Sequence, residues 1–141
     1  MIESIFSAGF TISEMIDGMV SIRVRSTFMR ICSGDRALSA VASILKHQFR
    51  PRDVLVRFGG DEFAILLPEV DEDVAMTIAD RVRQAVCGDT GDSDDSLIQI
   101  PIKISMGVAE HRQGATLSSL LRAADAALYR AKHAGRNVVS N

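Results

Sequence analysis

Three features that would each indicate a class of protein are missing from this sequence of 141 residues. It has no basic excess, since 16 Lys and Arg residues face 18 Asp and Glu residues, and this argues against a nucleic-acid partner. Its two cysteines, Cys32 and Cys87, show no metal-ligand spacing, so two thiols are expected, with a disulfide left open. No apolar run is long enough to cross a bilayer, and residues 1–16 lack the pattern of a signal peptide. We therefore expect a cytoplasmic location and no membrane span in this chain.

The patterns that are present indicate one globular domain over residues 1–141. The chain is 47% hydrophobic and 24% charged, which suits a single packed core. Helices that alternate with antiparallel-capable strands indicate an α+β fold, with a central, mostly antiparallel sheet covered by helices. The expected elements are a strand at about 19–25, a helix at 35–49, a hairpin of strands 54–58 and 63–67, a helix at 71–86, a strand within 97–110, a helix between Thr116 and Gly135, and a short strand at 137–139.

The hairpin is the most informative stretch. Both of its strands are apolar nearly throughout, so we expect both to be buried on two faces in the middle of the sheet. At the tip, Gly59 and Gly60 allow φ > 0 and a close approach by another molecule. Asp61 and Glu62 follow as adjacent carboxylates on a rigid support, and such ligands suit Mg²⁺ together with substrate phosphates. The alternative is a polar tip that only turns the chain.

Two other side-chain patterns lead to expectations about burial. Three arginines gather on and after strand 19–25, and they form either a solvated strand face or a contact for phosphate: Arg23, Arg25 and Arg30. Helical spacing predicts the inward-facing residues of helix 71–86: Val74, Ala75, Ile78, Val82 and Val86.

The stretch from Arg57 to Phe63, RFGGDEF, resembles the signature of the GGDEF family, the diguanylate cyclase domains, and the resemblance runs from about Ser33 to the C-terminus. It implies a fold similar to the palm of nucleotide cyclases and polymerases. It also implies a homodimer that joins two GTP molecules into cyclic di-GMP and releases pyrophosphate. By this resemblance Asp61 is a metal ligand and the proton acceptor, Glu62 is the supporting carboxylate, and the cofactor is Mg²⁺ or Mn²⁺. The nucleotide would lie against Gly59 and Gly60.

Two further stretches match the family. The segment 124–137 resembles its closing ADxALYxAKxxGRN pattern, in which Lys132 and Arg136 contact the triphosphate. The alternative is a pair of cations that stabilise a helix C-terminus. In the Gly-Asp pair at 34–35, Asp35 resembles the aspartate that reads guanine N1–H and N2–H₂, and a helix cap is the alternative. Asp125 and Tyr129 are expected to orient neighbours or to pack.

A third match is regulatory. The segment 50–53 is an RxxD motif five residues before Gly59, and its charged ends are Arg50 and Asp53. The resemblance implies that these residues, with Arg81 on the following helix, form an inhibitory site for the product cyclic di-GMP. Arginine binds phosphate bidentately and stacks on guanine, which suits this role.

The first part of the chain, 1–31, departs from the family, because the expected DxDxFK block is not found. Aligning on Phe28 puts Val24 and Ser26 at the two aspartates; alternatively Asp17, 18 positions before Asp35, is a second metal ligand. A cyclase is therefore one hypothesis, and a degenerate module that binds GTP or cyclic di-GMP without turnover is another. A purely structural partner domain is the third. The family also leads us to expect an upstream sensor or receiver domain.

Overall fold

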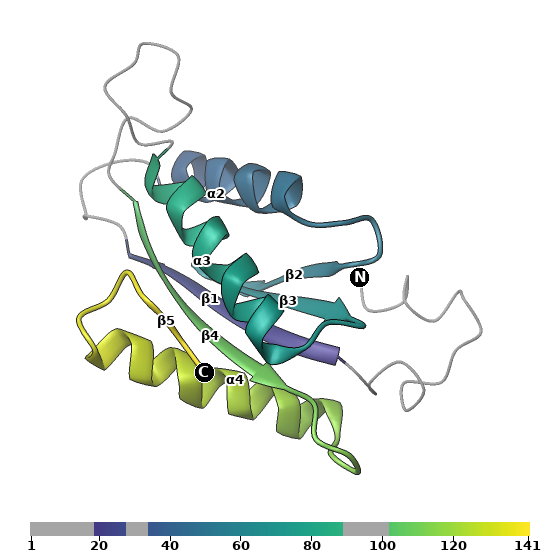
Figure 1. Cartoon of the computed structure of the whole chain (residues 1–141). Helices are drawn as coiled ribbons and strands as arrows, with labels where there is room; N and C mark the ends of the chain where they lie inside the picture. Colours follow the sequence, from purple (N-terminus) through teal and green to yellow (C-terminus); the bar gives the residue numbers. More distant parts are fainter. Residues whose placement is uncertain (1–18, 28–33, 89–101) are drawn as a thin grey trace.

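The computed structural model describes residues 19–27, 34–88 and 102–141 (Figure 1). Five strands and three helices follow one another along these residues: β1 (Met19–Thr27), α2 (Gly34–Gln48), β2 (Val54–Gly59), β3 (Glu62–Pro68), α3 (Glu72–Gly88), β4 (Lys103–Glu110), α4 (Leu117–His133) and β5 (Val139–Ser140). The strand expected at 19–25, the helices and the hairpin are all confirmed. None of the helices described is long and apolar enough to cross a membrane.

The strands form one sheet in the order β2-β3-β1-β4-β5, with β1 at its centre. The first four strands pair antiparallel, while β5 pairs parallel with β4, so the α+β fold with a mostly antiparallel sheet is confirmed. The expectation that both hairpin strands lie in the middle of the sheet is wrong for β2. Among the described strands β2 pairs with β3 alone, and its residues are half-buried or exposed. The neighbouring β3 is mostly buried, because it lies between β2 and β1.

The two faces of the sheet carry different helices. Successive side chains of a strand point to opposite faces. On β1, the alternate residues Val20, Ile22 and Val24 belong to the main core with residues of α2 and α3, while Arg23 points toward α4. Figure 1 shows the same layers, with α2 and α3 over one face and α4 along the other. On α3 the inward stripe is confirmed for Ala75, Val82 and Val86 and wrong for Val74, which is 47% exposed.

The helix α4 packs unusually close to β4. A Cβ atom added at Gly107 would lie 2.7 Å from Cα of Leu128, and nearer still to the backbone N of Leu128 and O of Ala124. Glycine is thus required at this position of β4, where backbone meets backbone. The buried face of α4 correspondingly carries small side chains, among them the fully buried Ala124 and Ala127. The helix is therefore held at a short, fixed distance from the sheet.

Both ends of α4 are capped by side-chain and backbone hydrogen bonds. The hydroxyl of Thr116 accepts from the backbone N–H of Ser119, and the Ser119 hydroxyl accepts from the N–H of Thr116, which makes a reciprocal capping box. This confirms Thr116 as the cap. At the other end the N–H of Ala134 donates to the Arg130 carbonyl, and Gly135 has φ +112°. The chain can then turn back into β5 alongside β4.

Candidate functional site

The tip of the β2–β3 hairpin is a tight turn that needs both glycines. Gly59 and Gly60 have φ +142° and +53°, which L side chains rarely adopt. A Cβ added at either would meet nothing within 4 Å, so the backbone here is open to another molecule. The guanidinium of Arg57 donates to the Gly60 carbonyl from Nε at 3.1 Å and Nη2 at 2.8 Å. The turn that presents Asp61 and Glu62 is therefore fixed by a side chain of the same hairpin.

The two carboxylates of the tip face an arginine from the central strand. Arg25 lies opposite Glu62 in the β1–β3 register. Its Nε lies 3.3 Å from Oδ2 of Asp61, and its Nη1 lies 3.6 Å from Oε1 of Glu62. Both carboxylates are partly exposed, and the Arg25 side chain is 46% exposed. The acidic pair thus shares one guanidinium at the rim of the sheet.

A second arginine joins the hairpin to α4. The side chain of Arg23 is only 9% exposed, and its Nε lies 2.5 Å from Oδ1 of Asp125 on α4. Its Nη2 lies 3.7 Å from Oε2 of Glu62, and its guanidinium carbon lies 4.3 Å from the centre of the Phe58 ring. A solvated strand face is therefore wrong for Arg23. Asp125 orients a neighbour, as expected.

The late lysine belongs to the same charged group. Burial lowers the pKa of the Lys132 ammonium, and the positive charge of Arg25 lowers this pKa further. The negative charges of Glu62, Asp61 and Asp125 act in the opposite direction. The effects of Glu62 and Asp61 require that Lys132 lies within electrostatic reach of the hairpin tip. The structure thus brings together a lysine and an acidic pair that stand about 70 positions apart in the sequence.

Arg136 follows α4 in a left-handed conformation, with φ +60°. Its backbone N–H donates to the Ala131 carbonyl at 3.3 Å, and its side chain is exposed. Within the described part of the chain, no ion pair or hydrogen bond joins that side chain to the hairpin. Its contact with a triphosphate stays a prediction.

The residues of the RxxD motif make the turn between α2 and β2. The Asp53 carboxylate accepts from the Arg50 N–H at 2.7 Å, and the Asp53 N–H donates to the Arg50 carbonyl at 3.0 Å. Arg81 on α3 donates from Nη2 to the carbonyl of Gln48 at 3.0 Å, two residues before Arg50. The three residues therefore lie in one exposed corner, with Asp53 serving as a turn residue. Their role as a product site stays a prediction.

Two aspartates of the predicted site remain, and the structure describes the backbone of Asp35 but not Asp17. Asp35 is the second residue of α2, so it lies in the first helical turn as expected, and its side chain lies outside the described set. Asp17, the alternative metal ligand, lies outside the described residues altogether, as do Arg30 and Cys32.

The described residues of the tip do not fit a divalent cation. Asp61 and Glu62 are oxygen ligands of the right kind, since Mg²⁺ commonly takes one or two carboxylates together with phosphates. Their charges are already matched by Arg25 and Arg23 at 3.3–3.7 Å. Within 19–27, 34–88 and 102–141 no group of three or more His, Cys, Asp or Glu residues is placed to hold a metal. This pairing was not predicted from the sequence, in which its signal was the i, i+2 spacing of Arg23 and Arg25 on one strand face.

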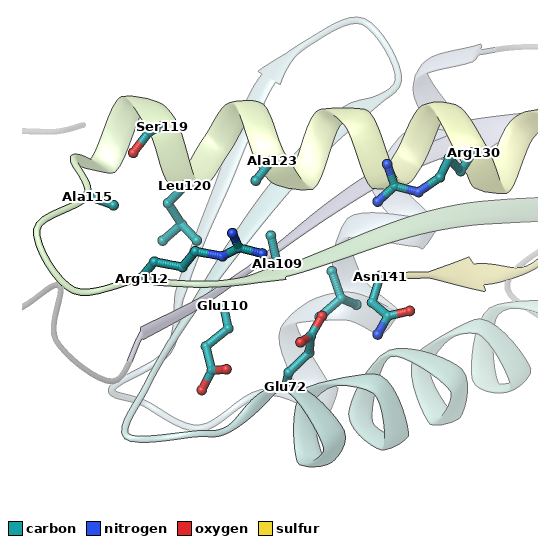
Figure 2. Close-up of a pocket in the computed structure, with 11 residues that line it drawn as sticks. Glu72, Ala109, Glu110, Arg112, Ala115, Ser119, Leu120, Ala123, Arg130 and Asn141 are labelled. Atoms are coloured by element: carbon teal, nitrogen blue, oxygen red, sulfur yellow. The ribbon is translucent and has the colours of Figure 1, made fainter.

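A pocket of about 570 Å³ opens elsewhere, between the start of α3, the end of β4 and the side of α4. Figure 2 shows its charged lining, with Glu72, Glu110, Arg112 and Arg130 among the residues around it. It contains none of the residues predicted for the functional site. Two acids and two bases balance there, so its lining favours no ligand of one charge.

Comparison with known proteins matches most of the chain. The family model described as diguanylate cyclase, GGDEF domain, matches residues 32–138. The probable diguanylate cyclase DgcT of Escherichia coli (strain K12) is 38% identical over 107 residues, which are 75% of this chain and 24% of that protein. The response regulator PleD of Caulobacter vibrioides (strain NA1000 / CB15N) is 36% identical over 107 residues, again 75% of this chain and 24% of that protein. The chain thus spans about a quarter of the length of the curated relatives it matches.

Solved structures match over a larger part of the chain. The GGDEF domain of DgcB from Caulobacter crescentus, in complex with c-di-GMP, has a TM-score of 0.76 at 27% identity and covers 91% of this chain and 79% of its own. Diguanylate cyclase SiaD from Pseudomonas aeruginosa, in complex with its activator SiaC, has a TM-score of 0.75 at 32% identity and covers 86% and 48%. The strand β1, with Arg23 and Arg25, precedes the residues that the family model matches.

Proposed function

The chain belongs to the GGDEF family of diguanylate cyclase domains, and on this premise we propose that its hairpin site binds a guanine nucleotide, GTP or cyclic di-GMP, in bacterial second-messenger signalling. The observation that carries the proposal is that the open glycine turn and the acidic pair lie together at the ends of the strands, within electrostatic reach of Lys132. A backbone without side chains lets phosphates approach closely, and a lysine supplies a point charge for them.

Each predicted residue has a part in this binding. Lys132 and Arg136 contact the phosphates from the end of α4, and Gly59 and Gly60 leave room for the nucleotide. Asp35, at the start of α2, accepts hydrogen bonds from guanine N1–H and N2–H₂, which adenine does not offer in this arrangement. The preference for guanine over adenine is thus expected to depend on Asp35.

Binding without turnover is the function that the site geometry favours. In the family reaction, the 3′-hydroxyl of one GTP attacks the α-phosphorus of the other in a two-fold dimer, and pyrophosphate leaves. Phosphoryl transfer depends on positioning and on neutralising charge at the phosphates. Here the carboxylate of Asp61, the expected proton acceptor, already pairs with Arg25, and Glu62 pairs with both arginines. The expected Mg²⁺ or Mn²⁺ cofactor has no support among these contacts.

Condensation of GTP is the second candidate, and the intact signature from Arg57 to Phe63 favours it. Isothermal titration with GTP and with cyclic di-GMP, beside mass-spectrometric detection of cyclic di-GMP after incubation with GTP and Mg²⁺, separates the two. Binding with no product is the expected result. Product formation that Asp61→Ala abolishes would establish the cyclase instead, and failure of both nucleotides to bind would refute the whole assignment.

Two cations of α4, Lys132 and Arg122, provide a variant and its control for the binding assay. Lys132→Ala is expected to weaken GTP binding about tenfold, because one charge near the phosphates is lost. Arg122 is an exposed cation on the same helix, and Arg122→Ala is expected to leave GTP binding unchanged. Equal effects of the two variants would mean that the helix acts through its net charge alone.

The corner of Arg50, Asp53 and Arg81 is the second nucleotide surface that we assign, for cyclic di-GMP alone. The exposed Arg81 on α3 donates to the carbonyl of Gln48 at the end of α2, two residues before the exposed Arg50. Because the relatives are about four times longer and one is a response regulator, we also assign an upstream sensor or receiver domain. A cytoplasmic location stays a prediction from the sequence. Arg81→Ala is expected to weaken the binding of cyclic di-GMP while GTP binding stays unchanged.

A further inference from the structure

The carboxylates at the hairpin tip have cationic partners within the protein. Asp61, Glu62 and Asp125 form ion pairs with the guanidinium groups of Arg23 and Arg25. Adjacent carboxylates repel each other unless a cation lies beside them. In this chain that cation is part of the protein.

The two arginines differ in how firmly they are held. Arg23 is buried, bonded to Asp125 and stacked on Phe58, so it is part of the packing between β1 and α4. Arg25 is half exposed, and its contacts of 3.3 Å and 3.6 Å are longer than the roughly 2.7–2.9 Å of a tight charge-assisted hydrogen bond. Arg25 is therefore the residue that can be changed without opening the core.

We propose that Arg25 acts as a built-in cation, which occupies the acidic pair and keeps divalent metal ions away from it. Its guanidinium lies beside one oxygen of each carboxylate, so an ion bound to these two oxygens would have to take its place. A divalent ion at that place would be a few ångströms from a fixed positive charge, and the repulsion lowers its affinity. Removing the charge of Arg25 is then expected to uncover a metal site formed by Asp61 and Glu62.

The same device makes nucleotide binding independent of metal, and this part rests on the proposed function. With the acidic pair neutralised by arginine, phosphates approach Lys132 without carboxylate repulsion. GTP is therefore expected to bind equally well with Mg²⁺ and with a chelator present. In the Arg25→Gln variant the acidic pair loses a cation that contacts both carboxylates, so GTP binding should become dependent on Mg²⁺.

The test is a titration with Mn²⁺, in which electron paramagnetic resonance counts the free ion and no nucleotide is present. Arg25→Gln removes the charge and keeps a polar side chain of similar reach, while Arg25→Lys keeps the charge. Arg25→Gln is expected to bind Mn²⁺ at least about tenfold more tightly than the unchanged protein. Arg25→Lys should bind it as weakly as the unchanged protein, and so should Arg52→Gln, which loses an exposed ion pair to Glu69.

Two additional variants keep the outcome decisive. Adding Asp61→Asn to Arg25→Gln should abolish the gain, which places the ion at the tip. If Arg25→Gln does not give the circular dichroism of the folded chain, Arg25→Thr replaces it, because threonine suits a strand. Tight Mn²⁺ binding by the unchanged protein, or an equal gain with Arg25→Lys, would overturn the proposal. Loss of all nucleotide binding would refute the proposed function alone, since the Mn²⁺ titration contains no nucleotide.

Discussion

The close approach of α4 to β4 makes a strong prediction about Gly107. In a Gly107→Ala variant the new methyl group would lie 2.7 Å from Cα of Leu128, whereas ordinary contact begins at 3.4 Å. The helix must then recede by at least about 0.7 Å, and by more to clear the backbone N of Leu128 and O of Ala124. These are backbone atoms of a capped helix, so no side chain can rotate away.

Overpacking of this kind costs about 1–3 kcal/mol, and we expect about 3 kcal/mol because only the whole helix can yield. In a domain of this size that corresponds to a fall in Tm of roughly 10 °C. Urea denaturation followed by circular dichroism measures the free energy of unfolding. A second readout is GTP affinity, which should fall because Asp125 and Lys132 move with α4.

The control is Gly88→Ala, at the last residue of α3, where an added Cβ meets nothing within 4 Å and φ is not positive. This change is expected to leave the free energy of unfolding within about 1 kcal/mol of the unchanged protein. A Gly107→Ala variant as stable as the Gly88→Ala control would show that α4 does not pack against β4 as described.

Two more changes test the contacts that hold α4. Thr116→Ala removes the hydroxyl of the capping box and is expected to lower the free energy of unfolding by about 1 kcal/mol, as urea denaturation would show; no change would mean that the cap does not form in solution. Asp125→Ala leaves the buried guanidinium of Arg23 with Glu62 as its ion-pair partner and should lower the free energy of unfolding by about 2 kcal/mol. Asp125→Asn keeps a hydrogen-bond acceptor and should lower it less. Equal losses from the two variants would contradict the charged pair.

Most of the fold could be predicted from the sequence, because each element has a local signal. The apolar stripe of α4 begins at a threonine cap and ends at Gly135, and the hairpin has two glycines between apolar runs. The acidic pair of the signature and Lys132 were also singled out from the sequence, and in the structure both carboxylates act electrostatically on the Lys132 ammonium. Helices, strands and turns can be predicted in this way because their signals come from residues that are close together in the sequence.

The rest depends on pairing between distant residues. An apolar run such as 54–58 looks the same at the centre of a sheet and at its edge, so the edge position of β2 was not predictable. The role of Arg23 follows from Asp125, which is 102 positions away, and no spacing rule connects them. Val74 is exposed for a different reason. Helical spacing predicts a broad apolar stripe on α3, but the sheet covers only part of that stripe.

The position of β1 has a consequence for how the molecule assembles. Val24 pairs with Phe63 on one side and with Met106 on the other, about 40 and about 80 positions along the chain, and such distant pairings slow folding. The β2–β3 hairpin pairs locally, whereas β4 joins the hairpin side of the sheet only through β1, and its other neighbour is the short strand β5. Among the described strands β1 alone bridges the two halves, so damage to it would divide the sheet rather than shorten it. The strand β1, which comes first among the described strands, is thus the common partner that joins β3 to β4.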